Sequence, residues 1–306
     1  MNPKYCTLET CSLEDAYMHY RPSIPGCIVY IALYGLLLVI QTIQCPIYRM
    51  WGFSGSMVIG LILDIIGYVA RILFHGDPFN FNYFLMNLIC LGLAPIFYCA
   101  ALYFLLGRVV TVYRGEDISR LRPRNYAIVF VSCDVFALIM QGAGGAITST
   151  APDDNPGLRD TGVNVMIAGL AFQVATLTLF ISFALEFIYR LIRRERRAGQ
   201  SDESKDEYAA LRARKTWKGF IMALVLATVT VYIRSIYRVV ELNGGFDSAV
   251  ANDEVAFMVL EGAMVSITCI CLTVMHPGMA LRTRGLKALL NQALHSWSLL
   301  ARQNRP

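Results

Sequence analysis

The chain has 306 residues, of which 56% are hydrophobic and 16% charged, and its mean hydropathy is +0.50. Soluble domains usually carry about 25% charged residues, so this composition excludes an ordinary soluble fold and indicates an integral membrane protein. The formal net charge of +5 is not by itself a signal for nucleic acid, because the basic residues concentrate in particular loops. We expect no nucleic-acid partner.

The first 23 residues form a polar segment ahead of the first apolar run. They lack the basic n-region and short apolar core of a cleavable signal peptide, so we expect the first run to act as an uncleaved signal anchor. Seven of the nine cysteines lie in or beside apolar runs, where Cys behaves as a small hydrophobe. Cys6 and Cys11 lie in the polar segment, where they either pair, if the segment faces an oxidising compartment, or stay free.

Seven apolar runs follow one another along the chain, and each has the roughly 20 residues that a membrane-spanning helix needs. They cover residues 24–43, 54–74, 83–107, 125–147, 163–189, 217–240 and 255–275. Turn-forming sequences separate them, such as His75-Gly76-Asp77-Pro78 and the Pro- and Asp-rich stretch 151–157. The pattern predicts an all-α polytopic membrane protein with seven transmembrane helices.

Basic residues lie on one side of this predicted bundle. The loops after the third and fifth runs and the C-terminal tail hold most of them, whereas the loops after the second and sixth runs contain no Lys or Arg. The positive-inside rule therefore places the N-terminus outside and the C-terminus in the cytoplasm. We predict an extracellular segment (1–23), a seven-helix domain (24–278) and a basic cytoplasmic tail (279–306), whose apolar residues recur at helical spacing as in a surface-bound amphipathic helix. The alternative for the tail is a frayed end with accidental periodicity.

Ionisable residues interrupt the runs, although each costs roughly 2.5–3.5 kcal/mol on insertion scales. Most of them share the middle and the outer half of the predicted bilayer. We predict a polar cavity that opens toward the outer leaflet and receives a charged head group; the alternative is a set of interhelical ion pairs that only fixes the bundle. The candidate substrate-binding residues are Asp64, Tyr68, Arg71, Asp134, Gln141, Gln173, Arg234, Tyr237, Arg238, Glu241 and Glu261.

Three local features accompany these charges. Glu186 lies near the inner end of its run, where it can either snorkel to the membrane surface or pair with Arg190 one turn later. Pro95 is expected to kink the third helix and free a carbonyl. The glycines after Gln141 (Gly142, Gly144 and Gly145) favour close helix packing, with a hinge as the alternative.

Motifs for the common enzymatic chemistries are absent from the sequence. There is no G-x-x-x-x-G-K-[ST] phosphate loop and no H-E-x-x-H pair, and the four histidines divide between the two predicted sides of the membrane. The seventh run has no lysine for a retinal Schiff base. We expect a protein that is not an enzyme and that uses no nucleotide, metal or cofactor.

Several segments stand in a specific order and spacing. They are Gly67-Tyr68-Val69-Ala70-Arg71, the stretch from Asp134 through Gln141 to Gly144-Gly145, Gln173, Arg234-Ser235-Ile236-Tyr237-Arg238-Val239-Val240-Glu241, Glu261, and His276-Pro277-Gly278. Over residues 24–278 they resemble the lipid-translocating exporter family of fungal seven-helix proteins, the RTA-like family. The resemblance implies a link to the export of sphingoid long-chain bases, to resistance against toxic amphiphiles in some members, and to porphyrin movement in one branch.

The resemblance and the buried charges together predict a transporter or translocase that exports or flips a lipid-like amphiphile and contributes to resistance. A protonated amine would seek the carboxylates, whereas an anionic head group would seek the arginines. Movement would be downhill or coupled to protons through the carboxylates.

The alternative function is a seven-helix receptor or membrane stress sensor for an amphiphilic ligand. The third run ends in Leu106-Gly107-Arg108 without an Asp-Arg-Tyr switch, and the seventh lacks N-P-x-x-Y, which disfavours this alternative. The expected partners are membrane lipids or amphiphilic small molecules, and the expected location is the plasma membrane, with an endomembrane as the alternative. The sequence carries no signal for an oligomeric state.

Overall fold

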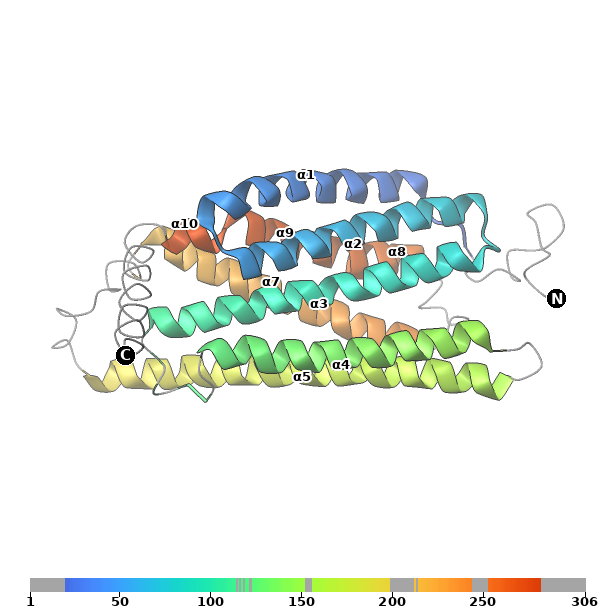
Figure 1. Cartoon of the computed structure of the whole chain (residues 1–306). Coiled ribbons are helices and arrows are strands. Elements are labelled where there is room, and N and C mark those ends of the chain that lie inside the picture. Colours follow the sequence, from blue (N-terminus) through green and yellow to red (C-terminus); the bar gives the residue numbers. More distant parts are fainter. Residues whose placement is uncertain are drawn as a thin grey trace, which may run out of the picture.

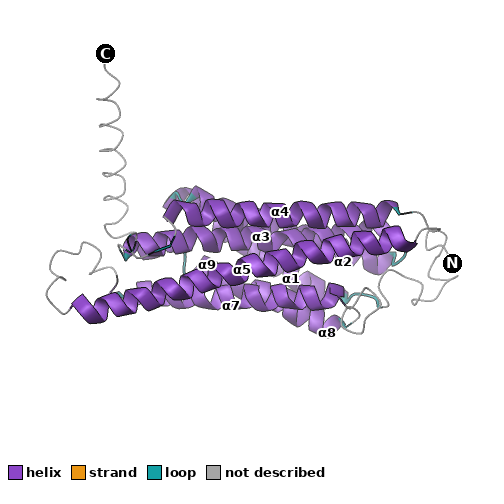
Figure 2. Ribbon diagram, turned by 90° about the horizontal axis from the view of Figure 1, so that it is seen from below, coloured by secondary structure: helices purple, strands orange, loops and turns teal. Residues whose placement is uncertain are grey.

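The structure, a computed structural model, describes residues 20–113, 115, 117, 119–120, 123–151, 156–198, 212, 214–243 and 253–281. Within these residues all regular elements are helices and no strand occurs (Figure 2). The Cys6 and Cys11 pairing, most of the basic loop after the fifth run and nearly all of the predicted tail helix lie outside the described residues.

Long helices make up the described chain, and the last of them is interrupted. They are α1 (Ile24–Tyr48), α2 (Trp51–Gly76), α3 (Phe81–Val112), α4 (Pro123–Thr150), α5 (Pro156–Ala198), α7 (Lys215–Asn243) and a final helix built from α8 (Glu254–Phe257), the π-helical η5 (Met258–Ala263) and α9 (Met264–Val274), followed by the short α10 (Pro277–Leu281). Seven helices of the described part are long and apolar enough to cross a membrane, which confirms the predicted number.

Most of the helices extend beyond the apolar runs, so those predicted bounds were too short, whereas the final helix (residues 254–274) matches the predicted run 255–275 within one residue. α5 shows the largest difference: it begins at Pro156, inside the predicted loop 151–157, and continues past Tyr189 to Ala198. Proline fits the first position of a helix because its missing N–H has no intrahelical partner there. The Arg-rich end continues the helix because Arg has a high helix propensity and needs no burial.

The helices form a ring with one contact across its interior. Following the ring, α1 packs on α2, α2 on α3, α3 on α4, α4 on α5, α5 on α7, α7 on α9, and α9 returns to α1. α3 also contacts α7 across the middle, and all the long helices lie roughly along one axis (Figure 1). This arrangement brings charged residues of α7 and η5 next to α3.

The outer surface of the ring is apolar and its interior is rich in aromatic side chains. Val29, Ile139 and Met222 are among the large hydrophobic residues that remain exposed, as expected where lipid is the solvent. Inside, the fully buried large side chains include Tyr34, Tyr68, Tyr98, Tyr103, Tyr126 and Trp217. Tyrosine hydroxyls inside an apolar core need hydrogen-bond partners, and several of them find partners in the site described below.

The glycines after Gln141 differ in their surroundings. A Cβ at Gly144 would lie 2.6 Å from the carbonyl oxygen of Gly162 and 2.7 Å from the backbone nitrogen of Met166, so α4 and α5 approach closely there. At Gly142 nothing lies within 4 Å of such a Cβ. The predicted close packing is therefore found at Gly144, whereas Gly142 borders open space.

We expect Gly144→Ala to destabilise the protein by about 1–3 kcal/mol, because the new methyl group meets backbone atoms that cannot move aside. Gly142→Ala is the matched control, two residues away on the same helix. It should leave stability unchanged or raise it slightly, since Ala has the higher helix propensity. Thermal unfolding in detergent measures both, and equal midpoints for the two variants would contradict the packing.

Candidate functional site

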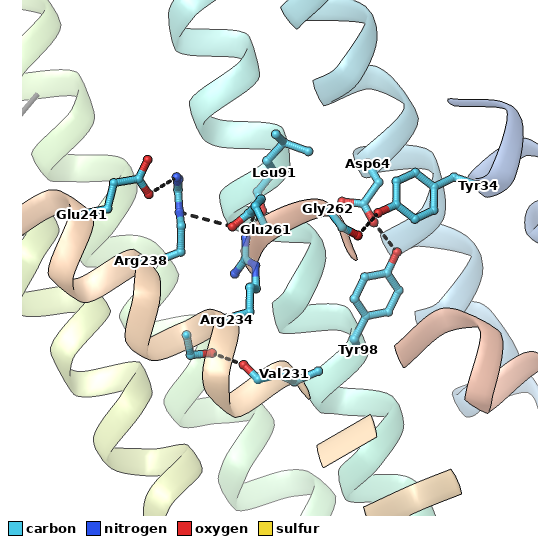
Figure 3. A network of polar contacts seen from close by, with 11 residues as sticks. Tyr34, Asp64, Leu91, Tyr98, Val231, Arg234, Arg238, Glu241, Glu261 and Gly262 are labelled. Atoms are coloured by element: carbon cyan, nitrogen blue, oxygen red, sulfur yellow. Dashed lines mark hydrogen bonds and ion pairs between the residues drawn. The ribbon is translucent and has the colours of Figure 1, made fainter. Parts of the chain in front are cut away.

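A buried arginine on α7 joins three helices at the centre of the bundle. Arg234 is 2% exposed. Its Nη2 donates to the carbonyl oxygen of Leu91 on α3 at 2.5 Å and forms an ion pair with Glu261 on η5 (Figure 3). One guanidinium nitrogen therefore connects α3, α7 and the final helix, which is built from α8, η5 and α9.

The Leu91 carbonyl is free to accept this bond because of Pro95. Proline has no N–H, so the carbonyl four residues before it loses its helical donor. α3 nevertheless continues through Pro95 from Phe81 to Val112. The sequence predicted a freed carbonyl at Pro95, and the structure shows that Arg234 supplies the replacement donor.

Glu261 lies within the π-helical turn η5, which widens the final helix between α8 and α9. The turn is supported by hydroxyls of α1: Tyr30 donates to the carbonyl oxygen of Met258 at 2.7 Å, and Tyr34 donates to that of Gly262 at 3.1 Å. π-Helical turns inside α-helices are frequent at functional sites. Here the turn brings a carboxylate into the interior, where it is 2% exposed.

Two further charged residues of α7 extend this arrangement into a network of two arginines and two glutamates. Arg238 pairs through Nη1 with Glu241 at 2.7 Å, and its Nε lies 3.9 Å from the second oxygen of Glu261. That oxygen, Oε2, has no hydrogen-bond partner, and neither has the Nε of Arg234. The charges balance, so the network is neutral as a whole and still offers one open acceptor and one open donor.

A cavity of about 120 Å³ lies beside this network, between α3, α4, α5 and α7. Its walls are mostly apolar, with leucine the commonest residue, and its polar groups are Gln141, Arg234 and Arg238. Two lining residues, Ile89 of α3 and Gly142 of α4, are also exposed, so the cavity reaches the outer surface of the bundle between these helices. It can take up a polar head group while an attached chain stays in lipid.

Gln173 supports the cavity without lining it. Its Oε1 accepts a hydrogen bond of 3.0 Å from the Nε2 of Gln141. Tyr237 is buried, and its hydroxyl has no hydrogen-bond partner.

The two aspartates of the candidate set are buried apart from the lining of the cavity and have tyrosines of α3 as partners. Tyr98 donates to Oδ2 of Asp64 at 2.5 Å (Figure 3), and Tyr103 donates to Oδ2 of Asp134 at 2.9 Å. Thr176 adds a longer contact to Asp134 at 3.4 Å. Among the described residues neither carboxyl forms an ion pair, so these groups are held by hydroxyls alone.

Arg71 and Tyr68 lie in a third place, near the end of α2. The Nη2 of Arg71 donates to the Tyr20 hydroxyl at 2.5 Å, and its guanidinium stacks on the Phe257 ring at 3.8 Å from the centroid. Tyr68 is buried, with no partner for its hydroxyl. The structure thus separates the predicted residues into the network beside the cavity, the two tyrosine-held aspartates on different sides of α3, and Arg71 with Tyr68. One common site for all of them stays a prediction.

Several residues of these clusters were absent from the sequence prediction. Tyr34, Tyr98 and Tyr103 look like ordinary apolar-run aromatics, because a tyrosine in such a run carries no charge to mark it. The signal that could have found Leu91 is Pro95, whose position fixes which carbonyl is freed.

At the other end of the bundle the predicted pair of Glu186 and Arg190 is present at 2.5 Å, and Arg120 joins it at 2.6 Å.

Fold and site together define an integral membrane protein whose seven helices enclose paired charges beside a cavity open at its side. Residues 57–284 match the family described as RTA1 like protein, and the chain belongs to this family, as its sequence motifs predicted.

Curated relatives from Saccharomyces cerevisiae cover most of the chain. It is 31% identical over 284 residues to the sphingoid long-chain base transporter RSB1 of strain Lalvin EC1118, covering 86% of this chain and 74% of the relative. It is 28% identical over 211 residues to Protein RTM1 (69% and 63% covered) and 25% identical over 238 residues to Protein RTA1 (76% and 70% covered). No solved structure matches the chain.

We expect Glu261→Gln to destabilise the protein by about 3–5 kcal/mol, because it leaves a buried guanidinium without its counter-charge. Glu186→Gln serves as the control, since it breaks an ion pair of the same type that is open to solvent. Its effect on the unfolding midpoint in detergent should be far smaller. Equal losses would show that Glu261 is not part of a tightly coupled buried pair.

The link between Pro95 and Arg234 is open to a double-mutant cycle. Pro95→Ala restores a backbone N–H, so the Leu91 carbonyl no longer depends on Arg234. We therefore expect the loss of stability caused by Arg234→Met to be about 1–3 kcal/mol smaller in the Pro95→Ala background, the range for a hydrogen bond to a charged group. Strict additivity of the two substitutions would contradict the proposed replacement of the helical donor.

Proposed function

We propose that this protein moves a sphingoid base, or a long-chain amphiphile of the same kind, across the bilayer. The observation that carries the proposal is the cavity between α3 and α4, because it opens at the side of the bundle next to buried arginines and glutamates. A site of this form receives a head group from within the membrane and leaves the chain in lipid. The name of the relative RSB1 supports the same substrate class.

The head group of a sphingoid base complements the network chemically. Such a base is a long-chain amino alcohol, so its head offers ammonium donors together with hydroxyl oxygens that accept. Glu261 Oε2 is an acceptor without a hydrogen-bond partner, and Arg234 Nε is a donor without one. One amino alcohol can therefore satisfy both groups, which an isolated amine or an isolated carboxylate cannot do.

The charge balance of the network suggests how an ammonium is accommodated. Arg238 holds Glu241 at 2.7 Å but reaches Glu261 only at 3.9 Å. An incoming ammonium can replace the longer contact while Arg238 keeps its shorter one. The bound cation then shares Glu261 with Arg234, so binding does not leave any arginine without a carboxylate.

The remaining parts of the proposal follow from this activity. Removal of a toxic amphiphile from the inner leaflet would contribute to resistance, and the plasma membrane is the place where export achieves that. The lysine and arginine distribution supports an orientation with the N-terminus outside. The site that we propose then faces the middle and outer half of the bilayer.

Transport by purified protein in liposomes tests the proposal. We expect wild-type protein to accelerate the transfer of a fluorescent sphingoid base between leaflets, measured by chemical quenching of the outer leaflet. Gly142→Trp should lower this flux at least tenfold, because the indole fills the opening while nothing lies within 4 Å of the new Cβ. An imposed pH gradient in the same liposomes tests proton coupling.

The matched control is Gly35→Trp on α1, another glycine with nothing within 4 Å of its Cβ and with no part in the cavity. This variant should transport at the wild-type rate. If the wild-type protein binds the base without moving it, the protein is a receptor and transport is refuted. If both tryptophan variants transport equally well, the opening between α3 and α4 is not the route.

A further inference from the structure

Arg71 differs from the other two buried arginines in having no carboxylate partner. Its side chain is fully buried, and no ion pair joins it to a carboxylate among the described residues. Two of its nitrogens, Nε and Nη1, have no hydrogen-bond partner. Arg234 and Arg238, by contrast, are each paired with a glutamate.

An arginine in this state is costly to bury. The guanidinium stays protonated at any physiological pH, and a buried charge without a counter-charge carries a desolvation penalty of several kcal/mol. Stacking of Arg71 on Phe257 at 3.8 Å and its contact with the ring of Tyr20 at 5.5 Å offset part of this penalty. Neither aromatic ring supplies a negative charge, and no carboxylate of the described residues lies within ion-pair distance of the Arg71 guanidinium.

The one hydrogen bond of Arg71 marks where an anion would bind. It runs from Nη2 to the hydroxyl of Tyr20 at 2.5 Å. A guanidinium can hold an oxyanion in a bidentate manner along two edges, Nε with Nη2 and Nη1 with Nη2. Nη2 belongs to both edges, so the tyrosine oxygen occupies the place of an oxyanion oxygen. The Tyr68 hydroxyl, one turn away on the same face of α2, is a second buried group without a partner and can donate to the same anion.

Tyr20 belongs to a short segment, residues 20–23, that crosses the ends of α2 and α8. Arg21 donates to the carbonyl oxygen of His75 at 3.0 Å, and the Nδ1 of His75 lies 2.7 Å from the carbonyl oxygen of Pro22. The backbone N–H of Ser23 donates to Glu254 at 2.5 Å. These bonds fix the segment on the bundle without the Tyr20 side chain, which can therefore turn away from Arg71 while the segment stays attached.

The depth of Arg71 indicates the kind of anion. It lies five residues before the end of α2 at Gly76, which is about 8 Å at 1.5 Å per residue. The 26 residues of α2 span about 39 Å, more than the roughly 30 Å of the hydrocarbon core. Arg71 thus lies near the boundary between hydrocarbon and head groups, where the phosphates of lipids are found. An arginine at this level can hold the phosphate of a lipid head group through charge-assisted hydrogen bonds.

We propose that Arg71 and Tyr68, once the Tyr20 side chain has turned away, form a binding site for the phosphate group of a membrane lipid, separate from the cavity beside Arg234. The phosphate takes the position of the Tyr20 hydroxyl and neutralises Arg71. The site is independent of the proposed transport, since it shares no residue with the cavity.

Thermal unfolding of the full-length protein in detergent tests this site with three probes: short-chain phosphatidic acid, diacylglycerol of the same chain length, and inorganic phosphate. We expect phosphatidic acid to raise the midpoint by several degrees and diacylglycerol to leave it unchanged. Inorganic phosphate should act only at much higher concentration. Equal shifts with diacylglycerol would refute phosphate recognition, and equal shifts with inorganic phosphate would refute a lipid as its source.

Variants assign the effect to Arg71. Arg71→Gln should weaken the binding of phosphatidic acid roughly 10- to 100-fold, as expected for loss of a charge-assisted hydrogen bond. Arg21→Gln should leave it unchanged, because the Arg21 side chain donates to the His75 carbonyl. Tyr20→Phe should strengthen binding, because the phosphate no longer displaces a hydroxyl. If Arg71→Gln does not fold, Tyr20→Phe decides: unchanged or weaker binding overturns the proposal. Unchanged binding by a folded Arg71→Gln overturns it as well.

Discussion

The bond between Arg234 and the Leu91 carbonyl is the interaction on which the centre of this bundle depends. A proline in α3 frees a carbonyl, an arginine of α7 satisfies it, and a glutamate in a π-helical turn neutralises the arginine. Each of these features would be unfavourable alone inside a membrane, where unsatisfied polar groups cost several kcal/mol. Together they compensate one another, and they fix the positions of three helices across the ring.

The same requirement explains how the other buried polar groups are arranged. Two carboxyls that form no ion pair among the described residues are held by tyrosine hydroxyls of α3, whose positions 98 and 103 place Asp64 and Asp134 against different sides of that helix. α3 is therefore the common partner of the buried acids and of Arg234. Its place in the ring, with a contact across the interior to α7, makes this possible.

The network beside the cavity stabilises the bundle and also offers polar groups that can bind a ligand. Its charges balance, which lowers the penalty of burying them, and its geometry leaves Glu261 Oε2 and Arg234 Nε without hydrogen-bond partners. A fully satisfied network would only hold the bundle together. Because this open donor and acceptor lie next to a lateral opening, the ion pairs form a candidate site for a head group. Arg71 likewise has buried nitrogens without hydrogen-bond partners, and it has no carboxylate partner among the described residues.

The sequence by itself determined the membrane class, the number of spanning helices and the family, because long apolar runs and the order of short motifs are properties of the chain alone. It also identified the pair of Glu186 and Arg190, which are neighbours on one helix, and it predicted that Pro95 frees a carbonyl, which follows from covalent structure, without identifying that carbonyl as Leu91. Helix bounds such as those of α5 were less accessible, since hydrogen bonding continues through polar residues that no apolar run includes. Only the tertiary structure decided which buried charges meet. Arg234 pairs with Glu261, whereas Arg71 faces Phe257 and Tyr20, and this difference arises from how the helices are rotated and packed in the ring, which the spacing of residues along one helix does not encode.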